Sequence, residues 1–367
     1  MPVVEQNKIK RSGVGLRAFD QNRVFPGFTL FAPLTANGAV YLLDLEGTVV
    51  HTWQMPYPPG MYGYLTDRGT LLYNGKTLDA STHLIDKRGK GGAILEADWN
   101  GRILWELHHA DHHHDGVRLR NGNVLIICVG PLPRDFIPKI QGGLPGTEHN
   151  GNIYADYLIE MTTSGQVVWE WRSWEHLDPE IDRITAVQDP RTEWTHANGL
   201  AELPDGNIVL SFRHISTVII IDRKTGKIIW KLGAPPLSGQ HAPTPLPNGN
   251  LLLFDNGPHR LDHSMSFSRV IEVELATKQI VWKYQEQREY EFFSPRMSNA
   301  QRLPNGNTLI CEADFGRLFE VTSEGELVWE YVNPYFNEGP NGLNNRVFRA
   351  YRYSPDEIAR AKATGGS

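Results

Sequence analysis

The sequence predicts an all-β protein made of six similar units. Two observations support this prediction. A strand–turn–strand segment recurs six times along the 367 residues, and a second turn with Asn-Gly or Asp-Gly precedes most of these hairpins. No helical periodicity runs between them. Units of about four antiparallel strands have the size of propeller blades, so we predict a six-bladed β-propeller. Solenoids and repeated sandwiches are the structural alternatives.

Each hairpin alternates apolar and polar side chains, and a glycine usually marks its turn. The second strand of each hairpin has a position for a large ring, which we expect to pack between blades. The ring position holds His51, Trp105, Trp169, Trp230, Trp282 and Trp329. The hairpins read AVYLLDLEGTVVHTW, AILEADWNGRILWEL, YLIEMTTSGQVVWEW, TVIIIDRKTGKIIWKL, RVIEVELATKQIVWKY and RLFEVTSEGELVWEY.

The strands at the two ends of the repeat array predict how the ring closes. GFTLFAPL (27–34) begins the first unit without a strand before it, and NNRVFRAYRYS (344–354) follows the sixth hairpin. We predict that this C-terminal strand completes the N-terminal blade, which protects both sheet edges. The predicted domain is residues 27–354, with 1–26 as an extension and 355–367 as a tail. Segments 130–155 and 172–194 are long insertions, of the kind that are usually functional.

Composition excludes several classes of function. The net charge is −6, which gives nucleic acid no electrostatic reason to bind. Apolar runs such as NVLIICV have the length of a strand, so we expect no membrane span. There are two cysteines and no leader-like segment at the start, so we expect a cytoplasmic protein without a disulfide framework. The oligomeric state is left open.

Polar residues recur at the start of the predicted inner strands. Counting back five residues from the Leu of each L-x-[ND]-G turn reaches His114, Asn198, His241 and Ser298; counting back seven reaches His112 and His196 in the first two of these strands. Strand side chains alternate with period two, so both rows are predicted to point toward the propeller axis. Converging titratable groups usually mark a site. Arg213 and Arg349 would add positive charge there, which suits an anionic ligand such as a sulfate ester.

Several motifs, in order, resemble the arylsulfotransferase family over about residues 25–353. They are HHHDG, THANGLAELPDGN, SFRHISTVIIIDRKTGKIIWKLG, GQHAPTPLPNGNLLLFDNG, SNAQRLPNGNTLI and VFRAYRY. The resemblance implies that His241 is the nucleophile that takes the sulfuryl group, and that His196 and Asn198 contact the transferring sulfate together with Arg213. It also implies that His114, or else His113, completes the site. Asn299 and Arg349, in the last two motifs, are further candidates for substrate binding.

The implied reaction moves a sulfuryl group from an aryl sulfate to a phenolic acceptor, through a sulfohistidine and without a nucleotide donor or a required cofactor. Neutral imidazole is a competent nucleophile near pH 7. Arginine, asparagine and histidine donors would stabilise the charge that develops on the sulfuryl oxygens and the phenolate. A second imidazole would take the proton of the acceptor.

Two alternatives remain. His114, His196 and His241 could hold a divalent transition metal, with Asp115 or Asn198 supporting the ligands, in a lyase, hydrolase or oxidase. The propeller could also be a non-catalytic scaffold, because this fold alone does not imply catalysis.

Overall fold

The computed structural model of the chain describes residues 13–78, 90–339 and 342–366. Six antiparallel sheets form the six blades, which confirms the predicted propeller. Blade 1 contains β27 (Val347–Tyr353), β2 (Phe28–Pro33), β3 (Ala39–Leu43) and β4 (Val49–Gln54); blade 2 contains β5 (Pro59–Leu65), β6 (Leu71–Lys76), β7 (Gly92–Ala97) and β8 (Ile103–His108); blade 3 contains β9 (His112–Arg118), β10 (Val124–Pro131), β11 (Tyr154–Met161) and β12 (Val167–Arg172).

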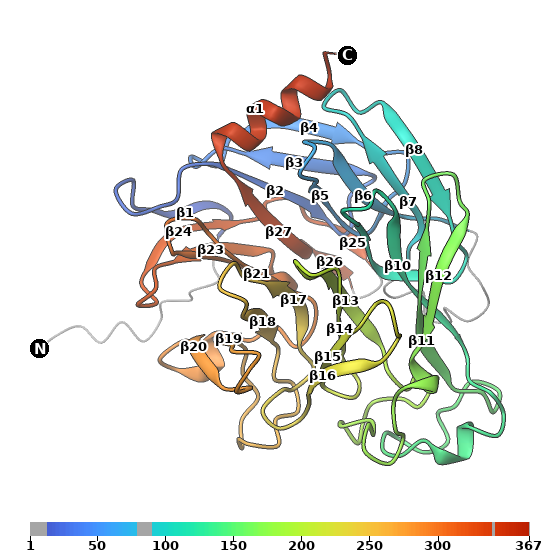
Figure 1. Cartoon of the computed structure of the whole chain (residues 1–367). Helices are drawn as coiled ribbons and strands as arrows, with labels where there is room; N and C mark the ends of the chain where they lie inside the picture. The colour runs from blue at the N-terminus through green and yellow to red at the C-terminus, as the bar shows by residue number, and fades with distance from the viewer. Residues whose placement is uncertain (1–12, 79–89, 340–341, 367) are drawn as a thin grey trace, which may run out of the picture.

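The other three blades follow the same order (Figure 1). Blade 4 contains β13 (Ala197–Glu202), β14 (Ile208–Phe212), β15 (Thr217–Ile221) and β16 (Ile228–Leu232); blade 5 contains β17 (His241–Pro245), β18 (Leu251–Asp255), β19 (Arg269–Val273) and β20 (Ile280–Tyr284); blade 6 contains β21 (Asn299–Arg302), β22 (Thr308–Glu312), β23 (Arg317–Val321), β24 (Leu327–Val332) and β1 (Gly15–Phe19). A small hairpin, β25 (Asn337–Gly339) with β26 (Gly342–Asn344), precedes β27.

Ring closure follows the prediction. Strand β27 pairs with β2, so strands from both ends of the repeat array share blade 1. The innermost strands are β5, β9, β13, β17, β21 and β27, and each contacts the next one around a closed ring. All six begin at the same end of the axis, because each pairs antiparallel with the second strand of its blade. Side chains at these strand starts therefore gather in one place.

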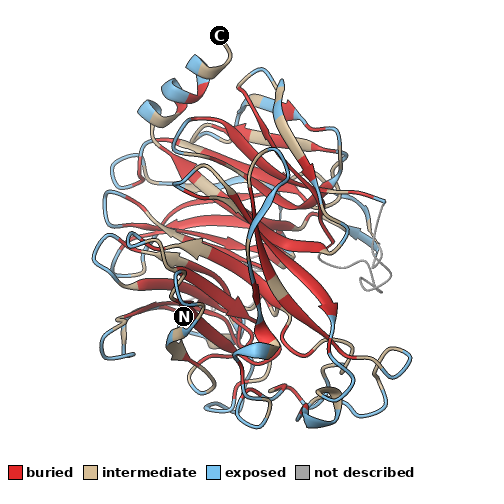
Figure 2. Ribbon diagram, turned by 45° about the vertical axis from the view of Figure 1, so that its right-hand side comes forward, coloured by how far each residue is buried: buried red, intermediate tan, exposed pale blue. Residues whose placement is uncertain are grey.

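The hydrophobic core lies between the blades rather than inside one of them. The middle strands are buried on both faces, as in β14 and β15, whereas the outermost strands are mostly exposed or half-buried, as in β16. Figure 2 shows this gradient as buried strands surrounded by exposed turns. Blades 4 and 5 share one cluster that includes Val209 and Leu251. Adjacent blades therefore stabilise each other by burying apolar surface.

The ring positions on the outer strands join neighbouring blades, as predicted. The indole nitrogens of Trp230, Trp282 and Trp329 each donate a hydrogen bond to a backbone carbonyl of the next blade. His51 replaces tryptophan in blade 1: its Nε2 lies 2.9 Å from the carbonyl oxygen of Trp99, on which its ring stacks. His51 therefore has the same structural role as the tryptophans.

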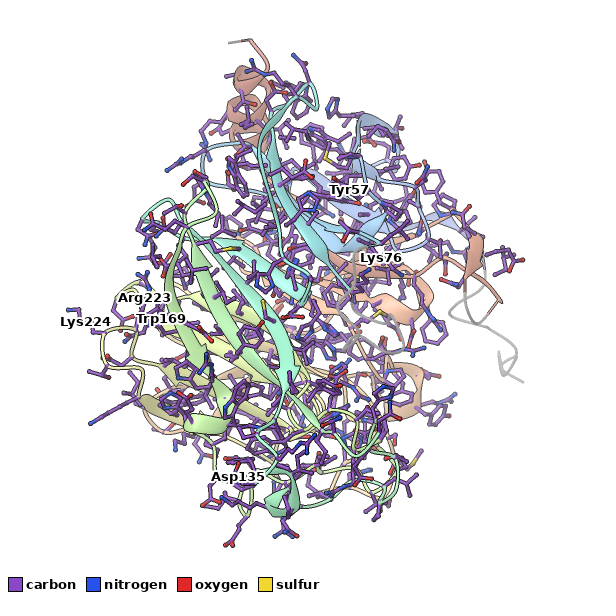
Figure 3. All side chains as sticks on the ribbon, turned by 90° about the vertical axis from the view of Figure 1, so that its right-hand side faces the viewer. Tyr57, Lys76, Asp135, Trp169, Arg223 and Lys224 are labelled. Atoms are coloured by element: carbon purple, nitrogen blue, oxygen red, sulfur yellow. The ribbon has the colours of Figure 1, made fainter. Side chains whose placement is uncertain are left out.

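A recurring arginine also connects the blades. Arg118, Arg302 and Arg352 lie near the ends of inner strands, and each guanidinium stacks on a tryptophan of the preceding blade. Each also contacts a glutamate of that blade, in the pairs Arg118–Glu96, Arg302–Glu272 and Arg352–Glu320. At the junction of blades 3 and 4, Arg223 instead pairs with Glu160, the strand partner of Trp169 (Figure 3). We call these contacts the inter-blade arginine pairs.

Both segments set outside the predicted domain contribute to the structure where it is described; residues 1–12 and 367 lie outside the described residues. Strand β1 adds a fifth strand to blade 6, pairing with β24. Helix α1 (Pro355–Thr364) starts with a capping box between Ser354 and Glu357 and buries Ile358 and Ala361 against blades 1 and 2. In Figure 1 this helix lies beside β4. Among the described residues no helix is long and apolar enough to cross a membrane.

The two insertions pack against each other at the end of the axis where the inner strands begin. Short bridges connect Gly142 with Ile184, Leu144 with Pro190 and Tyr154 with Glu193. Trp194 is fully buried beneath them, and its indole donates to the carbonyl oxygen of Asp182. Asp135 marks the first insertion at the lower end of Figure 3. The second insertion ends at β13, so it leads directly into the candidate site.

Candidate functional site

The inner strands bring His114, His196 and His241 to one place on the axis. The rings of His114 and His196 meet edge to face, with centroids 4.8 Å apart. The ring of Phe348 in β27 lies 6.4 Å from that of His114 and 6.5 Å from that of His241. His114 and His241 are buried, and the side chain of His196 is 20% exposed. His196 is thus the imidazole nearest to solvent.

Bulges at the strand starts decide which histidines face the axis. The pairing of β9 with β10 shifts between Ile126 and Cys128, and the pairing of β13 with β14 shifts between Ala197 and Gly199. His114 and His196 adopt left-handed backbone angles there, with φ of 53° and 52°. Such bulges re-aim side chains near functional sites. The expected strict alternation therefore does not hold.

His112 and His113 lie behind His114. Nδ1 of His112 accepts a hydrogen bond from the backbone amide of Gly92 in blade 2, so His112 turns away from the other imidazoles. Nδ1 of His113 lies 2.6 Å from Nδ1 of His114. Nε2 of His113 lies 2.9 Å from a carboxylate oxygen of Asp156, but the two atoms do not have the geometry of a hydrogen bond. Of the two residues that the sequence left open, His114 meets the other imidazoles and His113 supports it.

The charge states of the imidazoles differ because their partners differ. Burial, followed by the neighbouring imidazoles and Arg349, lowers the pKa of His114 well below its usual value. Burial and the charge of Arg213 do the same to the pKa of His241. Burial also opposes the charged form of His196, but the Glu193 carboxylate, 2.6 Å from its Nδ1, raises the pKa of His196 above its usual value. The site therefore combines two neutral imidazoles with one that favours the imidazolium form.

Glu193 belongs to the second insertion and was not predicted as a site residue. Burial alone would raise its pKa, but His196 lowers the pKa of Glu193 to about 2, so the Glu193 carboxyl is ionised at neutral pH. His214 stacks on His196 with centroids 4.5 Å apart, and burial together with the positive charges of His196 and Arg213 lowers the pKa of His214 to about 4. Its place beside Arg213 in SFRHIST was the one sequence signal for His214.

Arg213 is a partly exposed member of the site. Its side chain is 18% exposed, and a guanidinium nitrogen lies 3.4 Å from a carboxylate oxygen of Asp189 in the second insertion. Burial is the main cause of the lowered pKa values of His241 and His214, and the charge of Arg213 lowers both of them further. Arg213 thus supplies a partly exposed positive charge among the imidazoles.

A second group of polar side chains lies beside the histidines on the axis; we call Tyr62, Asp115, Asn198 and Arg349 the axial cluster. The guanidinium of Arg349 donates to Tyr62 Oη at 2.7 Å and to the backbone oxygen of Asn198 at 3.0 Å, and it pairs with Asp115 at 2.9 Å. Tyr62 donates to the other oxygen of Asp115 at 2.5 Å. The charge of Arg349 is thus balanced inside the protein, and its Nε is left buried without a partner.

The two predicted asparagines have different surroundings. Asn198 Nδ2 donates to the carbonyl oxygen of Gln240 at 2.8 Å, and its Oδ1 is buried without a partner. Asn299 exchanges two hydrogen bonds with the backbone of Ala350 in β27, through its Nδ2 at 2.9 Å and its Oδ1 at 3.0 Å. Asn198 retains free hydrogen-bonding capacity beside His196, whereas the side chain of Asn299 links two inner strands.

The donor atoms do not fit the metal alternative. Both ring nitrogens of His241 have partners inside the protein, Asn256 Oδ1 at 2.8 Å and the backbone amide of Met297 at 3.1 Å. Nδ1 of His114 faces His113. Across the described ranges, no three His, Cys, Asp or Glu side chains are arranged to hold a metal ion.

Fold and site together define a six-bladed propeller with histidines and arginine gathered at one end of its axis. The chain belongs to the arylsulfotransferase family, since the family model described as arylsulfotransferase (ASST) matches residues 28–237 and 236–331. Two curated relatives are both described as arylsulfate sulfotransferase AssT. The protein from Escherichia coli O6:H1 (strain CFT073) is 24% identical over 363 aligned residues, and that from Lelliottia amnigena is 27% identical over 363.

Each of these alignments covers 71% of this chain and 57% of the relative, so the chain spans little more than half the length of the relatives it matches. Among solved structures, a protein of unknown function from Bacteroides caccae matches with a TM-score of 0.57 at 14% identity, covering 89% of this chain and 99% of that one. That similarity supports the fold alone.

Proposed function

We propose that this protein transfers a sulfuryl group from an aryl sulfate to a phenol, through a covalent intermediate on His241 and without a nucleotide donor. The observation that supports this most directly is the pairing of a neutral, buried His241 with a neighbouring imidazole, that of His196, whose cationic form Glu193 favours. A neutral imidazole is the nucleophilic form, and a cation beside it stabilises the charge that develops on sulfuryl oxygens. Family membership and the two relatives named arylsulfate sulfotransferase agree with this reaction.

In the first step, the lone pair on His241 Nε2 attacks sulfur. The N–S bond forms while the bond from sulfur to the aryl oxygen breaks, and a phenolate leaves with the electron pair. His196 and Arg213 bind the sulfuryl oxygens, and Asn198 Nδ2 has a second hydrogen to donate beside its bond to Gln240. The lone pair points at the Met297 amide in the structure, so sulfur must replace that contact.

In the second step, the oxygen of an acceptor phenol attacks the same sulfur and the N–S bond breaks. His241 recovers its lone pair. His114 is a neutral imidazole whose ring meets that of His196, and it accepts the proton of the phenol as a general base. Two sequential transfers through one covalent intermediate predict ping-pong kinetics.

The test is incubation of the purified protein with 4-nitrophenyl sulfate, with and without phenol. We expect nitrophenol release that phenol accelerates, and, without phenol, an intact mass increased by one SO₃. His241→Gln should abolish both signals, since the removal of a covalent nucleophile typically costs orders of magnitude in rate. His108→Gln is the matched control, because His108 is exposed and pairs with Glu106 on the outer strand of blade 2.

A mass adduct that persists in His241→Gln would contradict the assignment of the nucleophile. Absence of any nitrophenol release, together with stoichiometric metal in the purified protein, would contradict sulfuryl transfer itself.

A further inference from the structure

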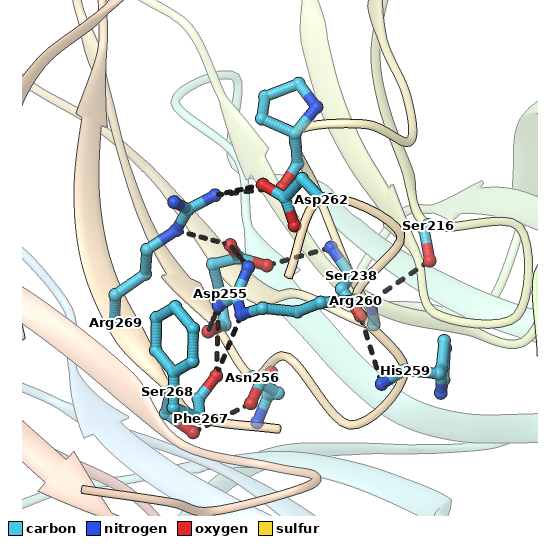
Figure 4. A network of polar contacts seen from close by, with 12 residues as sticks. Ser216, Ser238, Asp255, Asn256, His259, Arg260, Asp262, Phe267, Ser268 and Arg269 are labelled. Atoms are coloured by element: carbon cyan, nitrogen blue, oxygen red, sulfur yellow. Dashed lines mark hydrogen bonds and ion pairs between the residues drawn. The ribbon is translucent and has the colours of Figure 1, made fainter. Parts of the chain in front are cut away.

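Asn256 follows β18 and is fully buried beside His241. Its backbone position is fixed on both sides. Asp255 accepts from Arg260 at 3.0 Å and from Arg269 at 2.8 Å, as Figure 4 shows, and the next residue, Gly257, turns the chain at a φ of 69°. A Cβ on Gly257 would lie 1.9 Å from the carbonyl oxygen of Phe267, so only glycine fits. The FDNG sequence thus holds the Asn256 side chain in one place.

The surroundings of Asn256 determine the orientation of its amide. One atom of the amide lies 2.8 Å from the carbonyl oxygen of Ser294 and 3.0 Å from that of Met297. Carbonyl oxygens only accept hydrogen bonds, so this atom must be Nδ2, which has two hydrogens to donate. The other atom is therefore Oδ1, and it lies 2.8 Å from Nδ1 of His241.

The amide orientation in turn determines where the proton of His241 resides. Oδ1 of Asn256 only accepts, and so does the carbonyl oxygen of Gly239, 3.1 Å from the same Nδ1. Nδ1 must therefore carry the hydrogen. A neutral imidazole has one N–H, so Nε2 carries the lone pair. The backbone amide of Met297 is 3.1 Å from Nε2 and can only donate, which agrees independently with this assignment.

We propose that Asn256 is a positioning residue that holds His241 in the Nδ1–H tautomer and thereby makes Nε2 the attacking nitrogen. The role of the lone pair in attack rests on the proposed function; the tautomer itself does not. Asn256 touches no reacting atom and acts through His241. Hydrogen bonds to the second ring nitrogen commonly decide which nitrogen of a histidine reacts.

The test combines NMR with kinetics. In protein labelled with ¹⁵N at histidine and held at pH 8, the two ring signals of His241, assigned by their absence in His241→Gln, should have the shifts of a protonated Nδ1 and an unprotonated Nε2. Asn256→Ala should shift both signals toward the average of the two tautomers. It should also lower kcat for 4-nitrophenyl sulfate at least tenfold, with a smaller change in KM.

Asn256→Asp retains the acceptor for Nδ1–H but adds negative charge. It should preserve the tautomer while moving the acid limb of kcat/KM to higher pH, because a carboxylate favours the charged imidazole. This variant also keeps the proposal testable if the alanine variant does not fold. Ser268→Ala is the matched control: Ser268 donates to the backbone oxygen of Asn256, so its loss perturbs the same network without touching the imidazole.

An Nε2–H tautomer in the wild-type protein would overturn the proposal, and so would an unchanged tautomer in Asn256→Ala. If the wild-type tautomer is as described and responds to Asn256→Ala but the wild-type protein does not turn over an aryl sulfate, the positioning role is supported and the proposed function is wrong.

Discussion

At the residue scale, the sequence predicted the histidines of the site but not the groups that set their charge. His114, His196 and His241 were found because they recur at fixed distances from a turn motif. Glu193 and Asn256 lie in connections between strands, where no repeat register marks them. Glu193 acts through a 2.6 Å contact with His196, and Asn256 acts through a 2.8 Å contact with His241; only the folded chain makes these contacts. Repeat alignment predicts which side chains converge, and not which partners they meet there.

Glu193→Gln should change the pH dependence of the reaction. The wild-type carboxylate raises the pKa of His196, so the cationic form that we propose binds the sulfuryl oxygens persists to higher pH and is lost as pH rises through that pKa. Without the carboxylate, burial and Arg213 lower the pKa of His196. The alkaline limb of kcat/KM should therefore move to lower pH, with about a tenfold loss near pH 8.

The measurement is kcat/KM for 4-nitrophenyl sulfate between pH 5 and 9. Glu148→Gln is the matched control, since Glu148 lies in the other insertion and pairs with Arg191, 2.6 Å away, rather than with a site histidine. An unchanged alkaline limb in Glu193→Gln would mean that protonated His196 has no part in the reaction.

At the scale of secondary structure, hairpins and turns were predictable because each is specified by local residues. The turns Leu119–Asn123, Leu203–Asn207, Leu246–Asn250 and Leu303–Asn307 close with the same pair of backbone hydrogen bonds. The bulges in β9 and β13 were not predictable, because a bulge depends on the pairing of two strands and leaves the apolar pattern of each almost unchanged. Strict alternation therefore predicted that His112 and His114 point the same way, whereas the bulge in β9 turns them apart.

Arg352→Met tests the inter-blade arginine pairs. Arg352 and Glu320 are both fully buried at the junction of blades 6 and 1. Removing the guanidinium leaves the Glu320 carboxyl buried without its cation, which should lower the free energy of unfolding by about 3–5 kcal/mol. Adding Glu320→Gln should restore part of this loss, because the amide can still accept from the backbone amide of Phe25. Urea denaturation measures both changes.

Arg302→Met is the comparison, since the side chain of Arg302 is 19% exposed and solvent can compensate its glutamate partner in part. A loss of stability in Arg302→Met as large as in Arg352→Met would show that stacking on tryptophan matters more than burial of the charge.

At the scale of the whole molecule, the number of blades and the closure by a C-terminal strand were predicted and are confirmed. Both follow from counting units and from the need to pair every sheet edge. The fifth strand of blade 6 and the packing of α1 were not predicted. β1 lies outside the repeat array and fits no blade register, and α1 is a short helix whose burial depends on two blades at once.

Truncation tests the closure. A chain ending at Arg346 lacks β27, so the edge of β2 loses its partner strand and the apolar side chains around Phe31 lose the cover that β27 provides. We expect this chain to aggregate and to lack near-UV circular dichroism. A chain ending at Ser354 keeps β27 and loses only α1, with the burial of Ile358 and Ala361. It should be as monodisperse as the full chain, and its free energy of unfolding should be lower by about 2–3 kcal/mol. A folded, unaggregated chain ending at Arg346 would contradict the closure.

The common direction of the inner strands has a consequence for how this scaffold acquires new specificities. The far end of the ring consists mainly of short turns between neighbouring strands of a blade. The reacting groups stand at the other end, where the long connections at 130–155 and 172–194 also converge. Apart from Asp189 and Glu193, which pair with Arg213 and His196, residues of those connections can change while the inner strands keep the imidazoles in place. Selection for a new substrate can therefore act on these connections and leave the proposed chemistry intact.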